Sequence, residues 1–150
     1  AGFPNYFGQQ RFGRDNHNLQ LADQLLLQQQ RLGRQRGMAI SAARSWIFNH
    51  YLSDCLAAGI RPDPALTGPL IGKSRDPQPG EEKLDTQFAD WIAGLRRVGA
   101  RADVRPLFVQ PADLDWQQQE DTLHLSFRLP SGSYATALLR ELFIIEDAMR

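Results

Sequence analysis

The chain has 150 residues, of which 42% are hydrophobic and 23% are charged, and its formal net charge at pH 7 is zero. This length allows one domain with a real core, and the balanced charge excludes a bulk attraction to polyanions. No apolar run approaches the ~20 residues of a membrane span. The single cysteine, Cys55, excludes an internal disulfide and suits a reducing compartment.

The first third of the chain is basic and predicts a loop followed by two helices. Residues 1–50 hold six arginines and two acidic residues. Residues 1–18 mix aromatic residues, arginines and glycines, which is typical of a loop. Leucines recur at helical spacing in 19–32, and apolar residues line one stripe of 41–58. Ser41 suits the N-cap of this second helix, and Gly59 suits its C-terminal cap.

The middle of the chain differs in composition from the helical segment before it. Residues 60–80 contain five of the nine prolines and three glycines. A structureless stretch of ~20 residues is uncommon within a compact domain. We therefore expect either a functional loop or the scar of a missing insertion. Helical spacing returns at 84–98, and Gly99 closes that helix.

The last third of the chain adds strands. Residues 105–109 predict a short strand, and the clean alternation of 122–130 predicts a half-buried strand. The acidic run between residues 113 and 121 indicates a solvated turn. From Tyr134 to the end the spacing predicts an amphipathic helix. Long helices with a few strands indicate an α+β domain.

Four stretches, in order, point to one family. NYFGQQRFG, SAARSWIFN, TGPLIG and FRLPSGSYATALLREL together resemble the TruD family of tRNA pseudouridine synthases, from Phe3 to about Leu142. The resemblance implies part of a catalytic domain, with an antiparallel sheet and flanking helices, plus a shortened and largely helical insertion. It assigns residues 1–52 to the catalytic domain and 53–121 to the insertion. Residues 122–150 would then be the return strand and C-terminal helix of the catalytic domain.

The resemblance also implies an activity. Such enzymes isomerise the uridine at position 13 of tRNA to pseudouridine in the cytoplasm, with no metal or organic cofactor and no membrane. A catalytic aspartate in a GxKD motif, upstream of NYFG, starts the reaction. This sequence contains no match to that motif. We therefore expect a fragment that has no catalytic residue of its own and is inactive alone.

An enzyme that acts on a base must hold that base outside its stack, and aromatic rings and arginines suit that task. By resemblance, Asn5 and Phe7 line the uridine pocket, and Tyr134 reaches it from the other end of the chain. Two arginines would hold phosphates or brace the motif. The expected substrate-binding residues are Asn5, Phe7, Arg11, Phe12, Arg44 and Tyr134.

Simpler interpretations of these residues remain open: the aromatic side chains can be core residues, and the arginines can be solvated. A non-catalytic RNA-binding module and a small protein-interaction domain are the alternative functions. The stretch GPLIGKS does not fit a nucleotide-binding loop, since its glycines are too close together and Pro69 lacks an N–H. The three histidines are scattered, and no metal-ligand spacing is present.

Overall fold

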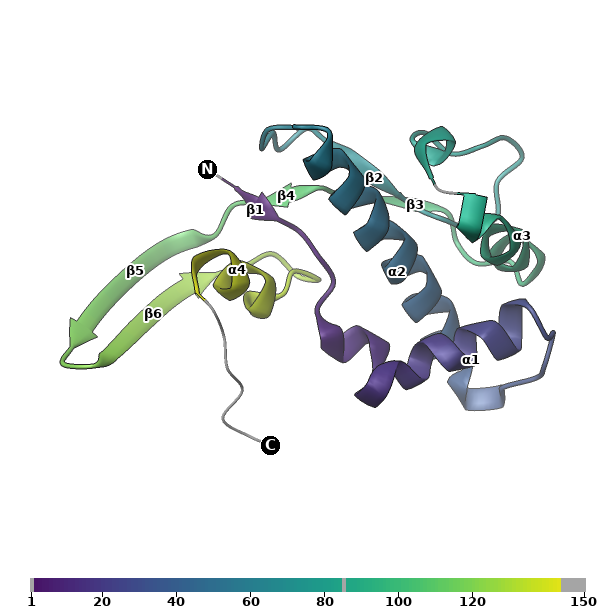
Figure 1. Ribbon diagram of the computed structural model, residues 1–150, viewed down its shortest axis with the longest axis horizontal. Coiled ribbons are helices and arrows are strands. Elements are labelled where there is room, and N and C mark those ends of the chain that lie inside the picture. The colour runs from purple at the N-terminus through teal and green to yellow at the C-terminus, as the bar shows by residue number, and fades with distance from the viewer. Residues whose placement is uncertain (1, 85, 144–150) are drawn as a thin grey trace.

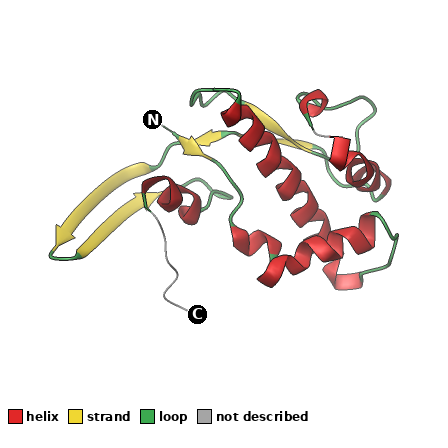
Figure 2. Ribbon diagram, viewed as in Figure 1, coloured by secondary structure: helices red, strands yellow, loops and turns green. Residues whose placement is uncertain are grey.

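The computed structural model describes residues 2–84 and 86–143 and confirms an α+β fold (Figure 1). Helices contain more residues than strands, and one pair of strands extends to the left of the view, away from the largest group of helices (Figure 2). The helices are α1 (His17–Leu26), α2 (Arg36–Ala57), α3 (Ala89–Arg97) and α4 (Ala135–Leu142). The strands are β1 (Phe3–Pro4), β2 (Thr67–Leu70), β3 (Asp103–Pro106), β4 (Phe108–Val109), β5 (Ala112–Gln119) and β6 (Thr122–Arg128).

In the described part of the chain the strands form three antiparallel pairs: β1 with β4, β2 with β3, and β5 with β6. The single strand expected at 105–109 is therefore wrong, because this segment changes partner at Leu107. The Leu107 N–H donates to the Leu66 carbonyl at 2.9 Å, and its own carbonyl accepts from the Asn5 N–H at 2.8 Å. One short segment thus joins the N-terminal strand to β2.

Helix α2 is the spine of the molecule and contributes to two hydrophobic clusters. Its first half, with Ala39 and Ile47, packs against α1 and α3. Its second half, with Phe48 and Leu52, packs against the segment around Phe108. Because a helix of 22 residues is about 33 Å long, one element can serve both clusters.

The ends of the helices confirm some sequence predictions and correct others. Gly59 is the predicted cap, with φ of 83°, and the Ile60 N–H donates to the Cys55 carbonyl at 3.2 Å. The predicted N-cap at Ser41 is wrong, because α2 already begins at Arg36. Helix α1 ends at Leu26 rather than near residue 32, so the glutamine run lies outside it.

The later helices are shorter than the spacing suggested. Helix α3 follows a 3-10 turn at Thr86–Phe88, and the predicted end at Gly99 is confirmed by its φ of 72°. Helix α4 ends at Leu142. Residues 144–150, which the sequence also assigned to this helix, lie outside the described residues.

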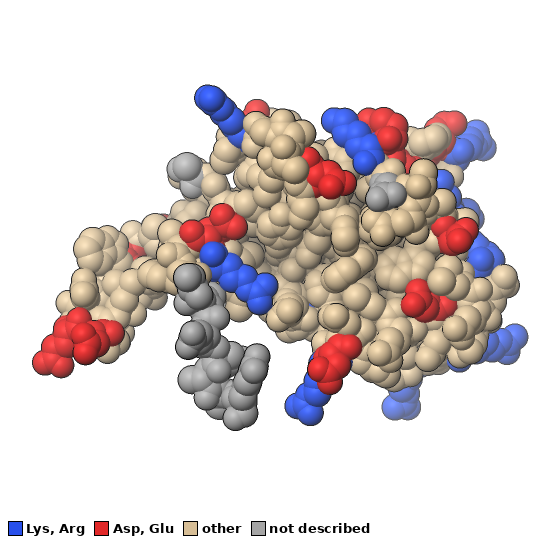
Figure 3. Space-filling model, viewed as in Figure 1, with Lys and Arg blue, Asp and Glu red and all other residues tan. Residues whose placement is uncertain are grey.

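Strands β5 and β6 form a long hairpin that extends away from the helices (Figure 1). The alternation predicted for β6 is confirmed, since Trp116 and Leu125 pair on one face while Gln117 and His124 pair on the other. The acidic run is only partly a turn, because its first half belongs to β5. Acidic side chains gather at the hairpin tip (Figure 3). The apolar face is exposed toward the tip, where Trp116 is 63% exposed, whereas Phe127 near the base packs against a small cluster that includes Phe3 and Val109.

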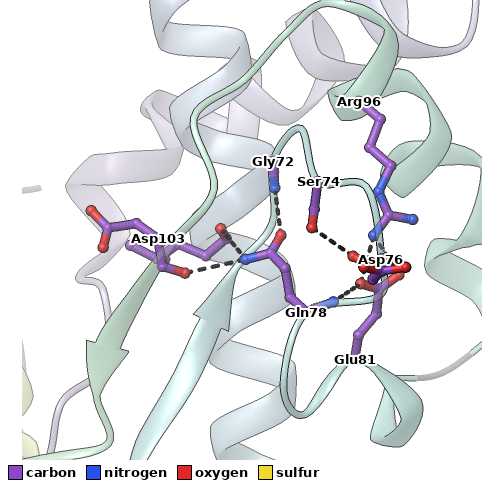
Figure 4. A network of polar contacts seen from close by, with 8 residues as sticks. Gly72, Ser74, Asp76, Gln78, Glu81, Arg96 and Asp103 are labelled. Carbon is purple, nitrogen blue, oxygen red and sulfur yellow. Dashed lines mark hydrogen bonds and ion pairs between the residues drawn. The ribbon is translucent and has the colours of Figure 1, made fainter.

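The proline-rich segment at 60–80, in which the sequence analysis assigned no helix or strand, contains β2 and an ordered loop built around Gln78 (Figure 4). The buried Gln78 amide accepts from the Gly72 N–H at 2.9 Å and donates to the Leu70 and Asp103 carbonyls at 3.2 and 3.3 Å. Its N–H donates to Glu81, whose carboxylate pairs with Arg96 at 2.6 Å. One buried amide thus satisfies the backbone of β2, β3 and the loop between them.

Two glycine positions predict opposite effects of the same substitution. At Gly94 in α3, a Cβ atom would lie 2.8 Å from the Leu26 Cβ and 2.9 Å from the Leu26 carbonyl oxygen. At Gly37, in the first turn of α2, nothing lies within 4 Å. We expect Gly94→Ala to lower the free energy of unfolding by about 1–3 kcal/mol, because α1 and α3 must move apart. Gly37→Ala should raise it by about 0.5–1 kcal/mol.

Urea unfolding of the two variants and the wild type measures both effects. Equal changes in the same direction would contradict the close α1–α3 contact.

Candidate functional site

The two ends of the described chain meet at Phe7 and Tyr134. Phe7 lies in the loop after β1, and Tyr134 is the N-cap residue of α4. Their ring centroids are 6.0 Å apart with an interplanar angle of 63°. Arg11 joins them: its Nε and Nη2 donate to the Tyr134 hydroxyl at 3.0 and 2.8 Å, and its Nη1 donates to Ser41 Oγ at 2.6 Å. Three of the six expected residues therefore form one cluster.

Arg105, at the β3 end of this cluster, is a residue that the sequence analysis missed. Its guanidinium carbon lies 3.9 Å from the centroid of the Phe7 ring. The same group donates to the Asn5 carbonyl at 3.1 Å, to Asn5 Oδ1 at 2.8 Å and to the Gly132 carbonyl at 2.8 Å. An arginine at the start of the apolar stretch RPLFV was the available signal, since a lone cation in such a strand needs buried partners.

Burial sets the electrostatics of this arginine. It lowers the pKa of Arg105 to about 10; the nearby Tyr134 hydroxyl opposes that shift and the charge of Arg11 adds to it. Arg105 therefore stays cationic at neutral pH. A cation over the face of an aromatic ring is attracted by the ring quadrupole, so Arg105 fixes the position of Phe7.

Asn5 lies behind the ring rather than on the surface. It is 2% exposed, and its Nδ2 donates to the Pro106 carbonyl at 2.9 Å while its Oδ1 accepts from Arg105. Both ends of the amide therefore have a protein partner, which fixes its orientation. In this arrangement Asn5 acts on the site through Arg105, and its direct contact with a base stays a prediction.

Asn49 of α2 holds the backbone of Phe7 and was also missed. The Phe7 N–H donates to Asn49 Oδ1 at 2.9 Å, and Asn49 Nδ2 donates to the Phe7 carbonyl at 3.0 Å. This pair satisfies both polar groups of one loop residue. The signal was present in SAARSWIFN, where an amide follows a run of core residues.

A cavity of about 390 Å³ opens beside the cluster, between the N-terminal loop, α2 and α4. Phe7 and Asn49 line it on one side, and Arg140 lines it on another. Phe12 is 3% exposed and packs edge to face on Trp46 with ring centroids 5.3 Å apart. Phe12 therefore supports the cavity wall. A cavity of this size can hold a small planar ligand.

Arg44 lies apart from the other five expected residues. Its Nε donates to the Ile71 carbonyl at 3.0 Å, and its Nη2 donates to the Arg101 carbonyl. Burial lowers the pKa of Arg44. These bonds connect α2 to the residue that follows β2 and to the segment just before β3. The geometry therefore fits the bracing role expected for Arg44 better than a phosphate contact.

Among the described residues, no group of three or more His, Cys, Asp or Glu side chains is placed to hold a metal ion. In the same part of the chain, no helix is long and apolar enough to cross a membrane.

Comparison with known proteins gives the family. A family model described as tRNA pseudouridine synthase D (TruD) matches residues 81–142. The chain is 33% identical to the tRNA pseudouridine synthase D of Aeromonas hydrophila over 186 residues, which cover 98% of this chain and 53% of that protein. The chain belongs to the TruD family. The proteins of the same name in Pseudoalteromonas translucida and Shewanella oneidensis are 34% and 36% identical, over 99% and 97% of this chain.

The chain spans about half the length of these TruD relatives. The matched regions are 186 and 183 residues long in the first two TruD relatives, whereas this chain has 150 residues. The relatives therefore carry residues inside the matched region that have no counterpart here. The family model matches residues 81–142, which include Tyr134 but not Phe7. The comparison with the Aeromonas protein covers 98% of this chain and therefore includes both residues.

The bonds of Arg105 predict that lysine cannot replace it. Lysine keeps the charge but lacks the planar fork that reaches Asn5 and Gly132 together. We expect Arg105→Lys to lower the free energy of unfolding by about 2–4 kcal/mol, because buried carbonyls lose their donors. Arg101→Lys, on an exposed side chain four residues away, should change it by less than about 0.5 kcal/mol. Urea unfolding measures both, and equal stabilities of the two variants would contradict the network.

Proposed function

We propose that this chain forms the uridine-binding wall of a TruD-type tRNA pseudouridine synthase. The observation that carries the proposal is the cluster of Phe7, Arg11 and Tyr134. Two stretches at opposite ends of the chain, NYFGQQRFG and GSYAT, meet there through the bonds from Arg11 to the Tyr134 hydroxyl. Relatives that match nearly the whole chain are named tRNA pseudouridine synthase D.

The geometry suits a base held outside its stack. Such a base loses its neighbours and gains from aromatic faces, at about 1–3 kcal/mol per base. Phe7 lines the cavity of about 390 Å³, and the Tyr134 ring lies at a fixed angle to Phe7 and lines the neighbouring hollow beside Arg11. Arg11 and Arg105 hold these rings from behind and give the site a positive potential, which favours the phosphates on either side of the target base.

The proposed reaction is an isomerisation of uridine at position 13 of tRNA. The bond between the ribose and the base nitrogen breaks, the base turns, and a bond to a base carbon forms, so no redox or group-transfer cofactor is needed. In the family an aspartate of the GxKD motif starts the reaction, and this sequence has no such motif. The residues described here therefore supply binding and orientation, and the chemistry needs a carboxylate from outside this sequence.

The domain division stays part of the proposal. The resemblance assigns residues 1–52 and 122–150 to the catalytic domain and 53–121 to a shortened insertion, whose helix α3 packs against α1. The greater length of the matched regions in the relatives supports a shortened insertion. Because β5 pairs with β6 across the boundary at residue 121, we propose to move this boundary to before Ala112, so that the hairpin lies in one domain. A tRNA partner and a cytoplasmic location follow from the same proposal.

Binding of unmodified tRNA tests the site. We expect Phe7→Leu and Tyr134→Ala to weaken binding by about tenfold each, because each removes a stacking face. Trp116→Ala is the matched control, since it removes an exposed aromatic side chain from the hairpin. Fluorescence anisotropy with labelled tRNA, and with the same tRNA carrying cytidine at the target position, measures affinity and discrimination.

The wild type should prefer the uridine form, and the two cluster variants should lose that preference. If the cluster variants bind like Trp116→Ala, or if the wild type binds tRNA no better than a duplex of random sequence, the proposed site fails.

The missing motif predicts that the purified chain does not isomerise uridine. Incubation with unmodified tRNA, followed by digestion and nucleoside chromatography, should detect no pseudouridine above a sample without protein. Repeated turnover by the chain alone would show that a carboxylate within this sequence can start the reaction.

A further inference from the structure

A second hollow lies at the far end of α1 from the Phe7 cluster, and its lining combines the apolar residues Leu25, Leu32 and Val98 with polar ones. It is formed where the chain turns from α1 into α2, against the C-terminal end of α3, and its volume is about 450 Å³. Arg31, Arg36 and Arg97 line it together with Gln29 and Gln30. We call this feature the arginine hollow. The proposed uridine site does not use any of these residues.

Of the residues that the structure describes, no Asp or Glu side chain lines the arginine hollow. The sequence has no Asp or Glu from residue 24 to residue 53, a stretch that contains four arginines. Within the described residues the ion pairs are Arg96 with Glu81 and Arg128 with Asp113, and neither lies in the hollow. At the helical end of the molecule, Lys and Arg side chains project into the solvent with some Asp and Glu side chains among them (Figure 3).

Two of the arginines are held in place by neutral groups. Arg36 Nη2 donates to the Val98 carbonyl at 2.6 Å, and Arg97 Nη2 donates to the Leu26 carbonyl at 2.8 Å. A guanidinium has five N–H donors, so these bonds leave most of them free. Carbonyl partners restrict the motion of the side chain without removing its charge. Arginines arranged in this way can bind phosphate oxygens in pairs.

We infer that the arginine hollow binds the phosphate backbone of RNA. The two glutamine side chains add neutral donors and acceptors, which proteins use on phosphate and sugar oxygens. Helix α1, of ten residues and about 15 Å in length, lies between the hollow and the N-terminal segment that carries Arg11, and this length equals that of several stacked nucleotides. A single tRNA can therefore reach both, and this part of the inference rests on the proposed function.

The salt dependence of RNA binding tests the inference. The variant Arg31→Gln/Arg36→Gln removes two charges from the hollow, and Arg61→Gln/Arg75→Gln removes two exposed charges from the loops on either side of β2. Anisotropy titrations use unmodified tRNA and a generic RNA hairpin at about 0.05–0.3 M KCl. Each phosphate contact contributes about 0.7–0.9 to the slope of log affinity against log salt.

We expect the hollow variant to lose between one and two units of that slope and to bind both RNAs about tenfold more weakly at low salt. The loop variant should match the wild type. Arg31→Lys/Arg36→Lys should keep the slope, since it keeps the charge. Arg31→Gln alone should lose about half as much of the slope. The Arg31 side chain makes no hydrogen bond among the described contacts, whereas Arg36 does, so this single variant tests the charge effect without removing a structural bond.

Equal slopes for the hollow and loop variants would overturn the inference. So would displacement of RNA by millimolar inorganic phosphate at constant ionic strength, because that result indicates a small-anion site. A failure of the proposed uridine site gives a different result: Phe7→Leu then keeps the preference for uridine. Binding of the generic hairpin depends on the hollow alone and tests the inference separately.

Discussion

The buried guanidinium of Arg105 is the interaction on which the rest of the candidate site depends. It contacts the Phe7 ring and donates to Asn5 and to the turn before α4 at Gly132. Burying an unpaired cation is costly, and here carbonyl and amide oxygens offset that cost. Three segments that are far apart in the sequence must therefore adopt positions that satisfy one side chain. The location of the aromatic rings follows from that requirement.

Helix α2 positions residues of both the candidate site and the arginine hollow. Asn49 in its second half holds the backbone of Phe7, Ser41 in its first half accepts from Arg11, and Arg36 at its start lines the arginine hollow. The helix is rigid and well buried, so a site placed on it is more precise than a site built from loops alone. The candidate uridine site and the arginine hollow are thus both supported by residues of α2.

Membership in the TruD family and the geometry of the site answer different questions. The family stretches identify which residues to examine, whereas the contacts separate them by what they touch. Phe7 and Tyr134 border the cluster, Asn5 supports it from inside, and Arg44 braces a different part of the fold. Residues that share one motif therefore need not share one role.

The sequence by itself determined the features that depend on neighbours along the chain. Helical spacing indicated α2 and α3, the glycines at positions 59 and 99 marked the ends of these helices, and alternation placed β6. These signals are local, because a helix or strand repeats its pattern every few residues. The ordered stretches from NYFG to GSYAT also carried the family without any structure.

Only the tertiary structure decided which distant groups meet. The bonds of Arg105 to Asn5 join residues 100 positions apart, and those of Arg11 to Tyr134 join residues 123 positions apart. No periodic pattern encodes such pairs, since each depends on how all the elements between them pack. The same reason explains the proline-rich segment, whose order comes from one amide, Gln78, that contacts two strands. Interactions between neighbours in the sequence therefore determine the helices and strands. The position of the candidate site is determined by buried polar groups, which must find hydrogen-bond partners in distant segments.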